Sequence, residues 1–150
     1  MASDPRLLGY LHRALAHEMA AVQQYMAQSR LCDQWNLADF CAHFREDVDE
    51  EIEHVKTLID TLVKLGVAPR AMQIAPARLG RSLRELIEID RILEVDAVRL
   101  YEEAAAYCAR VGDFQHESVF QSILRDELAH LQELDRMRAA LPAEEESRYA

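Results

Sequence analysis

The sequence predicts an all-α fold, a four-helix bundle with one long crossover connection, and three observations support this. Only 4 glycines and 4 prolines occur among 150 residues, which leaves few turns between long helices. Apolar residues recur at alternating spacings of three and four over long stretches, as on one face of a helix. The motif Glu51-x-x-His54 returns 76 positions later as Glu127-x-x-His130. Half of the residues are hydrophobic, enough for one core, so we expect residues 1–150 to form a single domain.

The internal repeat extends well beyond these two motifs. A shift of 76 positions superposes Glu18 on Glu94, Val22 on Val98, Tyr25 on Tyr101, Cys32 on Cys108, Phe44 on Phe120 and Leu58 on Leu134. Each half of the chain therefore contributes the same chemical groups a second time.

The first two helices are expected to form an antiparallel pair. Asp4 is a suitable N-cap and Pro5 a suitable first residue for the first helix, which breaks at residues 33–36. The second helix is expected over residues 37–65 and ends at Gly66. The connection between them is short, which makes the two helices antiparallel neighbours.

The third and fourth helices follow a long connection. Residues 67–80 contain two prolines and are expected to cross the whole length of the bundle, so that the third helix is parallel to the second. The third helix is expected over residues 82–110, with Ser82 as its N-cap, and the fourth over residues 114–140. Residues 143–150 are long enough for at most a short fifth helix.

Charge and composition exclude several classes of function. The net charge of −10 and the pI near 5.0 disfavour nucleic acid and anionic membranes as partners and favour cations. No apolar stretch approaches a membrane span and no signal peptide precedes the first helix, so a cytoplasmic location is expected. Cys32, Cys41 and Cys108 have no C-x-x-C spacing and are expected to be reduced core thiols.

Six ionisable residues interrupt the apolar seams of the four helices. They are Glu18, Glu51, His54, Glu94, Glu127 and His130. Residues i and i+3 share a helix face, so each Glu-x-x-His offers a carboxylate and an imidazole to one ion. A single glutamate of this set could lie at the edge of an apolar seam, and a single Glu-x-x-His could belong to a solvated helix face. Six together in one core would cost several kcal/mol each unless a metal compensated them. Iron or manganese suits this donor set, whereas zinc would bind without redox chemistry.

Four further residues are candidates for supporting these ligands. Tyr25 and Tyr101 follow Glu18 and Glu94 by two helical turns, from where each either hydrogen-bonds a carboxylate across the bundle or only packs in the core. Glu50 and Asp126 each precede a histidine by four residues, and are either carboxylate partners of a metal-bound imidazole or exposed helix acids.

The residues above resemble those of the ferritin-like di-iron proteins, and in particular of bacterioferritin. The likeness covers essentially the whole chain and includes Trp35, the long crossover and the segment 123–127. It implies a ferritin-like bundle with a short fifth helix and a di-iron centre in each subunit. In that centre Glu51 and Glu127 would bridge the two ions, while Glu18 with His54, and Glu94 with His130, complete one ion each.

The resemblance also implies a function. The chain would be a ferroxidase subunit of a 24-subunit homo-oligomeric shell that oxidises Fe(II) to Fe(III) with O2 or H2O2 and stores the ferric mineral. Glu46, Asp47 and Glu50 lie near the family's inner-surface iron site, but the histidine of that site is missing among them. The alternative is a small di-iron or di-manganese oxidase or peroxidase of the same fold that forms no cage.

Position 52 departs from the family pattern. Bacterioferritins have a methionine between the glutamate and histidine of the first motif, and two such methionines from paired subunits ligate a haem. This chain has Ile52, which has no donor atom. Haem is therefore not expected in a homo-oligomer, although a mixed shell with a haem-binding subunit remains open.

Overall fold

The computed structural model describes residues 4–71 and 73–142, which contain four long α-helices and no strand. The helices are α1 (Pro5–Gln34), α2 (Ala38–Lys64), α3 (Leu83–Arg110) and α4 (Phe114–Ala140). The all-α bundle expected from the sequence is confirmed, with helix ends that differ from expectation by no more than two residues. The short fifth helix was expected over residues 143–150, which lie outside the described residues. No described helix has both the length and the apolar character needed to span a membrane.

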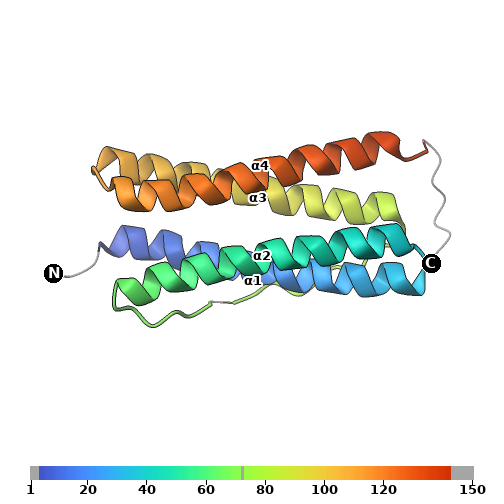
Figure 1. Ribbon diagram of the computed structural model, residues 1–150, viewed down its shortest axis with the longest axis horizontal. Coiled ribbons are helices and arrows are strands. Elements are labelled where there is room, and N and C mark those ends of the chain that lie inside the picture. The colour runs from blue at the N-terminus through green and yellow to red at the C-terminus, as the bar shows by residue number, and fades with distance from the viewer. Residues whose placement is uncertain (1–3, 72, 143–150) are drawn as a thin grey trace.

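The four helices form two antiparallel hairpins joined by the crossover (Figure 1). α1 and α2 form the first hairpin, and α3 and α4 form the second. The segment between α2 and α3 runs back along the bundle, so that α3 starts at the same end as α2 and runs parallel to it. This topology is the one that the length of the connection predicted.

Side chains at the helix starts explain why the helices begin where they do. Asp4 accepts a hydrogen bond from the backbone N–H of Arg6 at 2.9 Å, and Ser82 accepts one from Glu85 at 3.1 Å. The Glu85 carboxylate in turn accepts from the backbone N–H of Arg81 at 2.9 Å. The capping box expected at Ser82 therefore forms with its return bond one residue earlier than in the usual motif.

The crossover is fastened to α1 by the amide side chain of Gln24. Gln24 Nε2 donates to the carbonyl oxygen of Arg78 at 2.8 Å, and the backbone N–H of Arg78 donates to Gln24 Oε1 at 2.8 Å. The amide thus satisfies both backbone groups of one loop residue, as a neighbouring strand would. Gln24 is buried and lies on α1, as does Glu18. Its two hydrogen bonds therefore hold the crossover against the helix that supplies Glu18.

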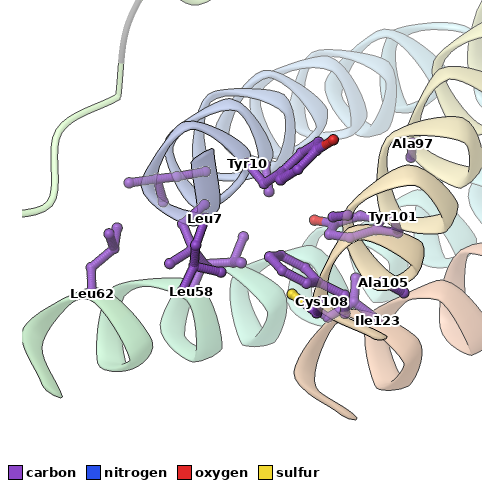
Figure 2. Close-up of a cluster of buried hydrophobic side chains, with 14 residues drawn as sticks. Leu7, Tyr10, Leu58, Leu62, Ala97, Tyr101, Ala105, Cys108 and Ile123 are labelled. Atoms are coloured by element: carbon purple, nitrogen blue, oxygen red, sulfur yellow. The ribbon is translucent and has the colours of Figure 1, made fainter. Parts of the chain in front are cut away.

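Two hydrophobic clusters fill the interior, one toward each end of the bundle. The first core cluster, shown in part in Figure 2, includes Leu11, Leu58, Tyr101, Cys108 and Phe120. The second core cluster includes Tyr25, Cys32, Phe44, Leu86 and Leu134. The shift of 76 positions exchanges the clusters, because Phe44 of the second corresponds to Phe120 of the first. The bundle therefore has an approximate internal two-fold symmetry, and the polar residues lie in the layer between the clusters.

The three cysteines belong to the interior. Cys32, Cys41 and Cys108 are all buried and none forms a disulfide. Burial raises the pKa of Cys32 to about 12 and that of Cys108 to about 11. Thiols with such pKa values behave as small core residues, as the sequence predicted.

Candidate metal centre

The six seam-breaking residues converge at mid-height of the bundle. α1 and α3 each supply one glutamate, Glu18 and Glu94, while α2 and α4 supply the two Glu-x-x-His pairs. All four glutamates are at most 1% exposed. Carboxylates with so little contact with water need compensating charge from within the protein.

Their donor atoms form two overlapping groups of four. One group comprises Glu18, Glu51, His54 and Glu127, and the other comprises Glu51, Glu94, Glu127 and His130. Within each group the donor atoms all lie within 4.8 Å of one another. Glu51 and Glu127 belong to both groups, which is the arrangement needed for two ions that share two bridging carboxylates.

The imidazoles face the carboxylates through their Nδ1 atoms. His54 Nδ1 is 2.9 Å from Glu127 Oε1 and 3.1 Å from Glu51 Oε2. His130 Nδ1 is 3.1 Å from Glu51 Oε1 and 3.7 Å from Glu127 Oε2. The terminal carboxylates lie at 3.6 Å for His54 and Glu18, and at 3.7 Å for His130 and Glu94. Each histidine therefore contacts one terminal carboxylate and both shared ones.

Several of these atoms have no hydrogen-bond partner among the described residues. They are Glu18 Oε2, Glu51 Oε1, Glu94 Oε2, Glu127 Oε1 and His130 Nδ1. The short ion-pair distances above do not change this, because a hydrogen bond also requires a suitable donor angle. Buried acceptors aimed at a common centre without a donor are what a cation site requires. The donor set, oxygen-rich with two imidazoles, fits two iron or manganese ions.

The pKa values show how the site is compensated by protons. Burial raises the pKa of Glu51 to about 8, with the neighbouring Glu18 charge adding to the shift. Burial together with Glu127 likewise raises the pKa of Glu94 to about 8. Burial alone would raise the pKa of Glu18, but the neighbouring Glu51, the His54 imidazole and the Tyr101 hydroxyl outweigh it and lower the value to about 2.

The two imidazoles supply positive charge. Burial opposes protonation of His54 and His130, yet the surrounding glutamates outweigh burial and raise both pKa values far above the ordinary 6.5. Protons on the imidazoles and on two of the glutamates therefore compensate the buried carboxylates, as divalent cations would do when bound.

Two tyrosines bind the terminal carboxylates from across the bundle. Tyr101 donates its hydroxyl hydrogen to Glu18 Oε1 at 2.6 Å, and Tyr25 donates to Glu94 Oε1. Each bond links a tyrosine of one hairpin to a glutamate of the other. Both tyrosines are at most 2% exposed, and burial together with these carboxylates raises their pKa values. The hydroxyls therefore remain donors, which orients Glu18 and Glu94.

Glu50 and Asp126 contact the histidines, but not those of their own helices. The Nε2 atom of His54 lies 2.9 Å from Asp126 Oδ2, and the Nε2 atom of His130 contacts Glu50. Spacing along the chain had pointed to histidines four residues later on the same helix, and that pairing is wrong. Nδ1 points into the site, so Nε2 points toward the neighbouring antiparallel helix and meets its carboxylate.

A cleft of about 610 Å³ opens beside the centre, between α2 and α4. His54, His130 and Tyr25 line it together with acidic side chains from both helices. Asp47 and Glu50 form a third group of close donor atoms with His130, whereas Glu46 is an exposed residue of the cleft wall outside that group.

Sequence reasoning missed one residue of this cleft. His43 Nε2 lies 3.2 Å from Asp47 Oδ2, one helical turn earlier on α2. The spacing of four residues was the available signal, since it places the imidazole and the carboxylate on one helix face. An imidazole therefore lies beside Asp47 in the wall of this cleft.

Ile52 lies between the two residues of the first motif but on another face of α2. It is half-buried and packs against the second core cluster. Its side chain has no atom that could ligate a metal.

Comparisons with known proteins agree with this architecture. Residues 8–143 match the ferritin-like domain of the ferritin family. The chain is 36% identical over 135 residues to a bacterioferritin of Rhodobacter capsulatus, covering 90% of this chain and 84% of the relative. It is also 30% identical over 149 residues to a bacterioferritin of Brucella melitensis, covering 99% of this chain and 92% of that relative.

A solved structure of the Rhodobacter capsulatus bacterioferritin superposes with a TM-score of 0.88. The two share 34% sequence identity, and the match covers 93% of this chain and 87% of the other. That protein is described with a metal-free dinuclear site and a haem iron. Fold, sequence and family model thus agree, and the chain belongs to the ferritin family as a relative of the bacterioferritins.

Proposed function

We propose that this chain is an iron-storage subunit with ferroxidase activity, and that Fe(II) is its substrate at the candidate metal centre. The observation that supports this most directly is the pair of overlapping donor groups that share Glu51 and Glu127. Exposed acidic clusters are common on proteins, but four buried glutamates beside two histidines, with an unpartnered donor atom on five of these six residues, are not.

Two iron ions bound there would supply electrons for the reduction of dioxygen or peroxide. The chain itself provides positioning and charge. Tyr101 and Tyr25 hold the terminal carboxylates, while Asp126 and Glu50 hold the imidazoles with Nδ1 toward the centre. These contacts fix the donor atoms before any ion arrives, which lowers the cost of organising the site.

We further propose that the Fe(III) product is stored inside a shell of 24 subunits. The relatives that support this share most of their length with the chain. The cleft between α2 and α4, with His43, Asp47 and Glu50, would then be the route by which iron passes between the centre and the shell interior. Carboxylates along such a route favour cations over anions.

We propose that a homo-oligomer of this chain binds no haem. The solved Rhodobacter capsulatus relative is described with a haem iron, and the resemblance assigns haem ligation to the position of Ile52. Native mass spectrometry together with the visible spectrum tests shell and haem at once. A dimer as the only species would favour the cage-less oxidase or peroxidase, and a Soret band in the purified homo-oligomer would contradict the haem proposal.

Anaerobic Fe(II) titration tests the ferroxidase proposal. Binding should saturate near two ions per chain, and admission of air should then produce a ferric-oxo absorbance. The double variant Glu18→Ala, Glu127→Ala should lose rapid oxidation, because it removes one terminal and one shared carboxylate. Undiminished oxidation in this variant would place the chemistry elsewhere.

Asp60→Asn provides the matched control. Asp60 is an exposed carboxylate on α2 that pairs with Lys64 at 2.9 Å, away from the centre. Removing its charge should leave both binding and oxidation unchanged. Equal losses in the control and the double variant would point to general destabilisation instead of ligand loss.

A further inference from the structure

A groove away from the metal centre lies where the crossover leaves α2 and passes the start of α1. The start of α1 and the end of α2 lie at the same end of the bundle (Figure 1). The hollow between α1 and the crossover, here named the α1–crossover groove, has a volume of about 550 Å³, within the usual range of small-molecule sites. One of its walls belongs to residues 67–70 of the crossover. The other wall is a stripe of α1 that consists of Pro5, Leu8, Gly9 and His12.

The missing side chain of Gly9 keeps this groove open. Residues of the stripe follow one another at spacings of three, one and three positions, which places them on one face of α1. A Cβ atom added to Gly9 would meet no atom within 4 Å, so the space beside it is empty of described residues. Glycine inside a helix costs about 0.5–1 kcal/mol relative to alanine. Packing among the described residues gives no reason for glycine at this position, whereas an open groove does.

The internal repeat shows that the fold does not require such a groove. In the other half of the bundle Arg84 donates to the carbonyl oxygen of Pro142 at 2.7 Å, and Glu88 pairs with Arg138 at 3.1 Å. These long side chains join the start of α3 to the end of α4. The shift of 76 positions replaces three residues of the stripe by charged ones, with Arg84 for Leu8, Glu85 for Gly9 and Glu88 for His12. The first half of the chain therefore has an open groove where the second half has ionic contacts.

Two polar side chains line the groove, and both are available to a ligand. The Nε2 atom of His12 is buried and has no hydrogen-bond partner among the described residues. A buried polar nitrogen of this kind calls for a partner that the chain itself does not supply. Arg70 is exposed and forms no ion pair with any other described residue.

The charges around the groove favour an anion, although the chain as a whole has a net charge of −10. No acidic side chain is among the described residues that line it. α1 begins at Pro5, so the positive end of its helix dipole lies beside the groove. The planar guanidinium of Arg70 matches a carboxylate in geometry and charge. Leu8 and Val67 are only partly buried and offer apolar surface to the rest of the ligand.

We propose that the α1–crossover groove binds a small organic monocarboxylate with an apolar body. Its carboxylate accepts hydrogen bonds from the Arg70 guanidinium and from the Nε2–H of His12. The apolar body lies in the space beside Gly9. A neutral molecule of the same shape would leave the charge of Arg70 without a partner, and a cation would be repelled by it.

This site is separate from the candidate metal centre. Glu18 is the only residue of the centre on α1, and it follows His12 by six positions. None of the residues that line the groove belongs to the donor groups of the centre. Ligand binding in the groove is therefore a property in addition to the proposed ferroxidase function and does not depend on it.

Fluorine NMR with para-fluorophenylacetate tests the proposal on the purified full-length protein in its native oligomeric state. The fluorine signal should broaden in the presence of protein, and binding should saturate at one molecule per chain. The amide of the same acid has the same body without the charge and should bind about tenfold more weakly or less. Equal binding of acid and amide would overturn the proposal. So would the absence of saturable binding, whether a neighbouring copy covers the groove or nothing binds there.

Substitutions at Gly9 locate the bound probe. Gly9→Leu should fill the groove and abolish binding, and the variant should be at least as stable as the parent, because the added Cβ meets no atom within 4 Å and leucine favours a helix. Gly9→Ala provides a similar gain in helix propensity with a much smaller side chain, so it should retain most of the binding. Undiminished binding in Gly9→Leu would mean that the probe lies elsewhere and would contradict the proposal.

Substitutions of the polar residues test how the carboxylate is held. Arg70→Gln should weaken binding about tenfold or more, since it removes a charge-assisted hydrogen bond. His12→Phe keeps an aromatic ring of similar shape but removes Nε2, and should also weaken binding. Arg30→Gln is the matched control, because Arg30 is an exposed arginine at the other end of α1 that pairs with Asp33 at 3.6 Å. Equal losses in Arg30→Gln and Arg70→Gln would indicate general attraction of anions and would overturn the assignment.

Thermal melting gives an independent readout. A ligand that binds only the folded state raises the melting temperature as its concentration increases. para-Fluorophenylacetate should therefore raise the melting temperature of the metal-free parent and of Gly9→Ala, but not that of Gly9→Leu. Equal shifts in the parent and Gly9→Leu would contradict binding in the groove. All of these variants should bind and oxidise Fe(II) as the parent does, so the groove and the ferroxidase proposal are judged by separate measurements.

Discussion

Binding of divalent metal should release the protons that compensate the buried carboxylates in the metal-free centre. Glu51 and Glu94 have pKa values of about 8, and the pKa values of both imidazoles lie well above neutrality. At pH 7 these four groups together hold about four protons, which two metal ions must displace. The exchange is electrically balanced, because two divalent ions bring the charge that four protons remove.

Raising the pH should reduce this release in a predictable way. At pH 9, Glu51 and Glu94 have lost most of their protons before metal arrives, so the release falls to about two protons, those of the imidazoles. Zn²⁺ is the appropriate probe since it binds the same donors without redox chemistry. Calorimetric titrations in buffers of different ionisation enthalpy measure the number. A release below about two protons at pH 7, or one that is equal at pH 7 and pH 9, would refute the assignment.

Four further outcomes are expected. The pKa values of the same two glutamates are raised from 4.5 to about 8 in the folded state, so their stabilisation is present below pH 4.5 and is lost as the pH rises. Between pH 6 and 8 the two glutamates alone should lower the free energy of unfolding of the metal-free protein by about 5 kcal/mol in urea denaturation, and the raised pKa values of the two histidines act in the same direction. A flat profile would contradict this. Tyr101→Phe leaves the buried Glu18 carboxylate without its hydroxyl donor and should cost about 1–3 kcal/mol of unfolding free energy. No measurable cost would mean that this bond does not orient Glu18. Tyr25→Phe with Glu94→Leu removes both members of the corresponding buried pair; the metal-free double variant should be as stable as the parent at pH 8, or more stable, while Zn²⁺ should raise its melting temperature less than that of the parent. Leu58→Ala in the first core cluster should cost about 2–5 kcal/mol by thermal denaturation, with Val63→Ala on the exposed face of α2 as the control, and equal effects would mean that the core assignment is wrong.

The helices and the identity of the converging residues could be read from the sequence because both depend on local periodicity. Asp4 with Pro5, and Ser82 with Glu85, mark helix starts through bonds that span only a few residues. The repeat of 76 positions linked Glu51 to Glu127 without any knowledge of packing. The length of residues 67–80 was sufficient to set the topology, since a short connection would have made α2 and α3 antiparallel.

Contacts between helices were harder to anticipate, because they depend on which faces meet and at what level. Glu50 and Asp126 were recognised as partners of imidazoles, but the spacing along each helix indicated the wrong histidine. The pairing of His43 with Asp47 was overlooked although its spacing was local. The proximity of Tyr10 to Tyr107 could not be inferred at all, because these residues are far apart in the chain and have no counterparts in the repeat.

Each histidine of the centre contacts a carboxylate of the opposite hairpin, and these contacts influence how the molecule opens. His54 is oriented by a carboxylate of the second hairpin, and His130 by one of the first, so neither hairpin can assemble a metal site by itself. The hairpins meet along the bundle, and at the polar layer between the two core clusters they are joined without metal only by carboxylates and imidazoles that protons compensate. Separation of the two hairpins should therefore be the easiest large fluctuation of the metal-free protein, and bound ions should suppress it. In hydrogen exchange, amides on both sides of the layer would slow together on metal binding, as expected if the ions hold the two hairpins together.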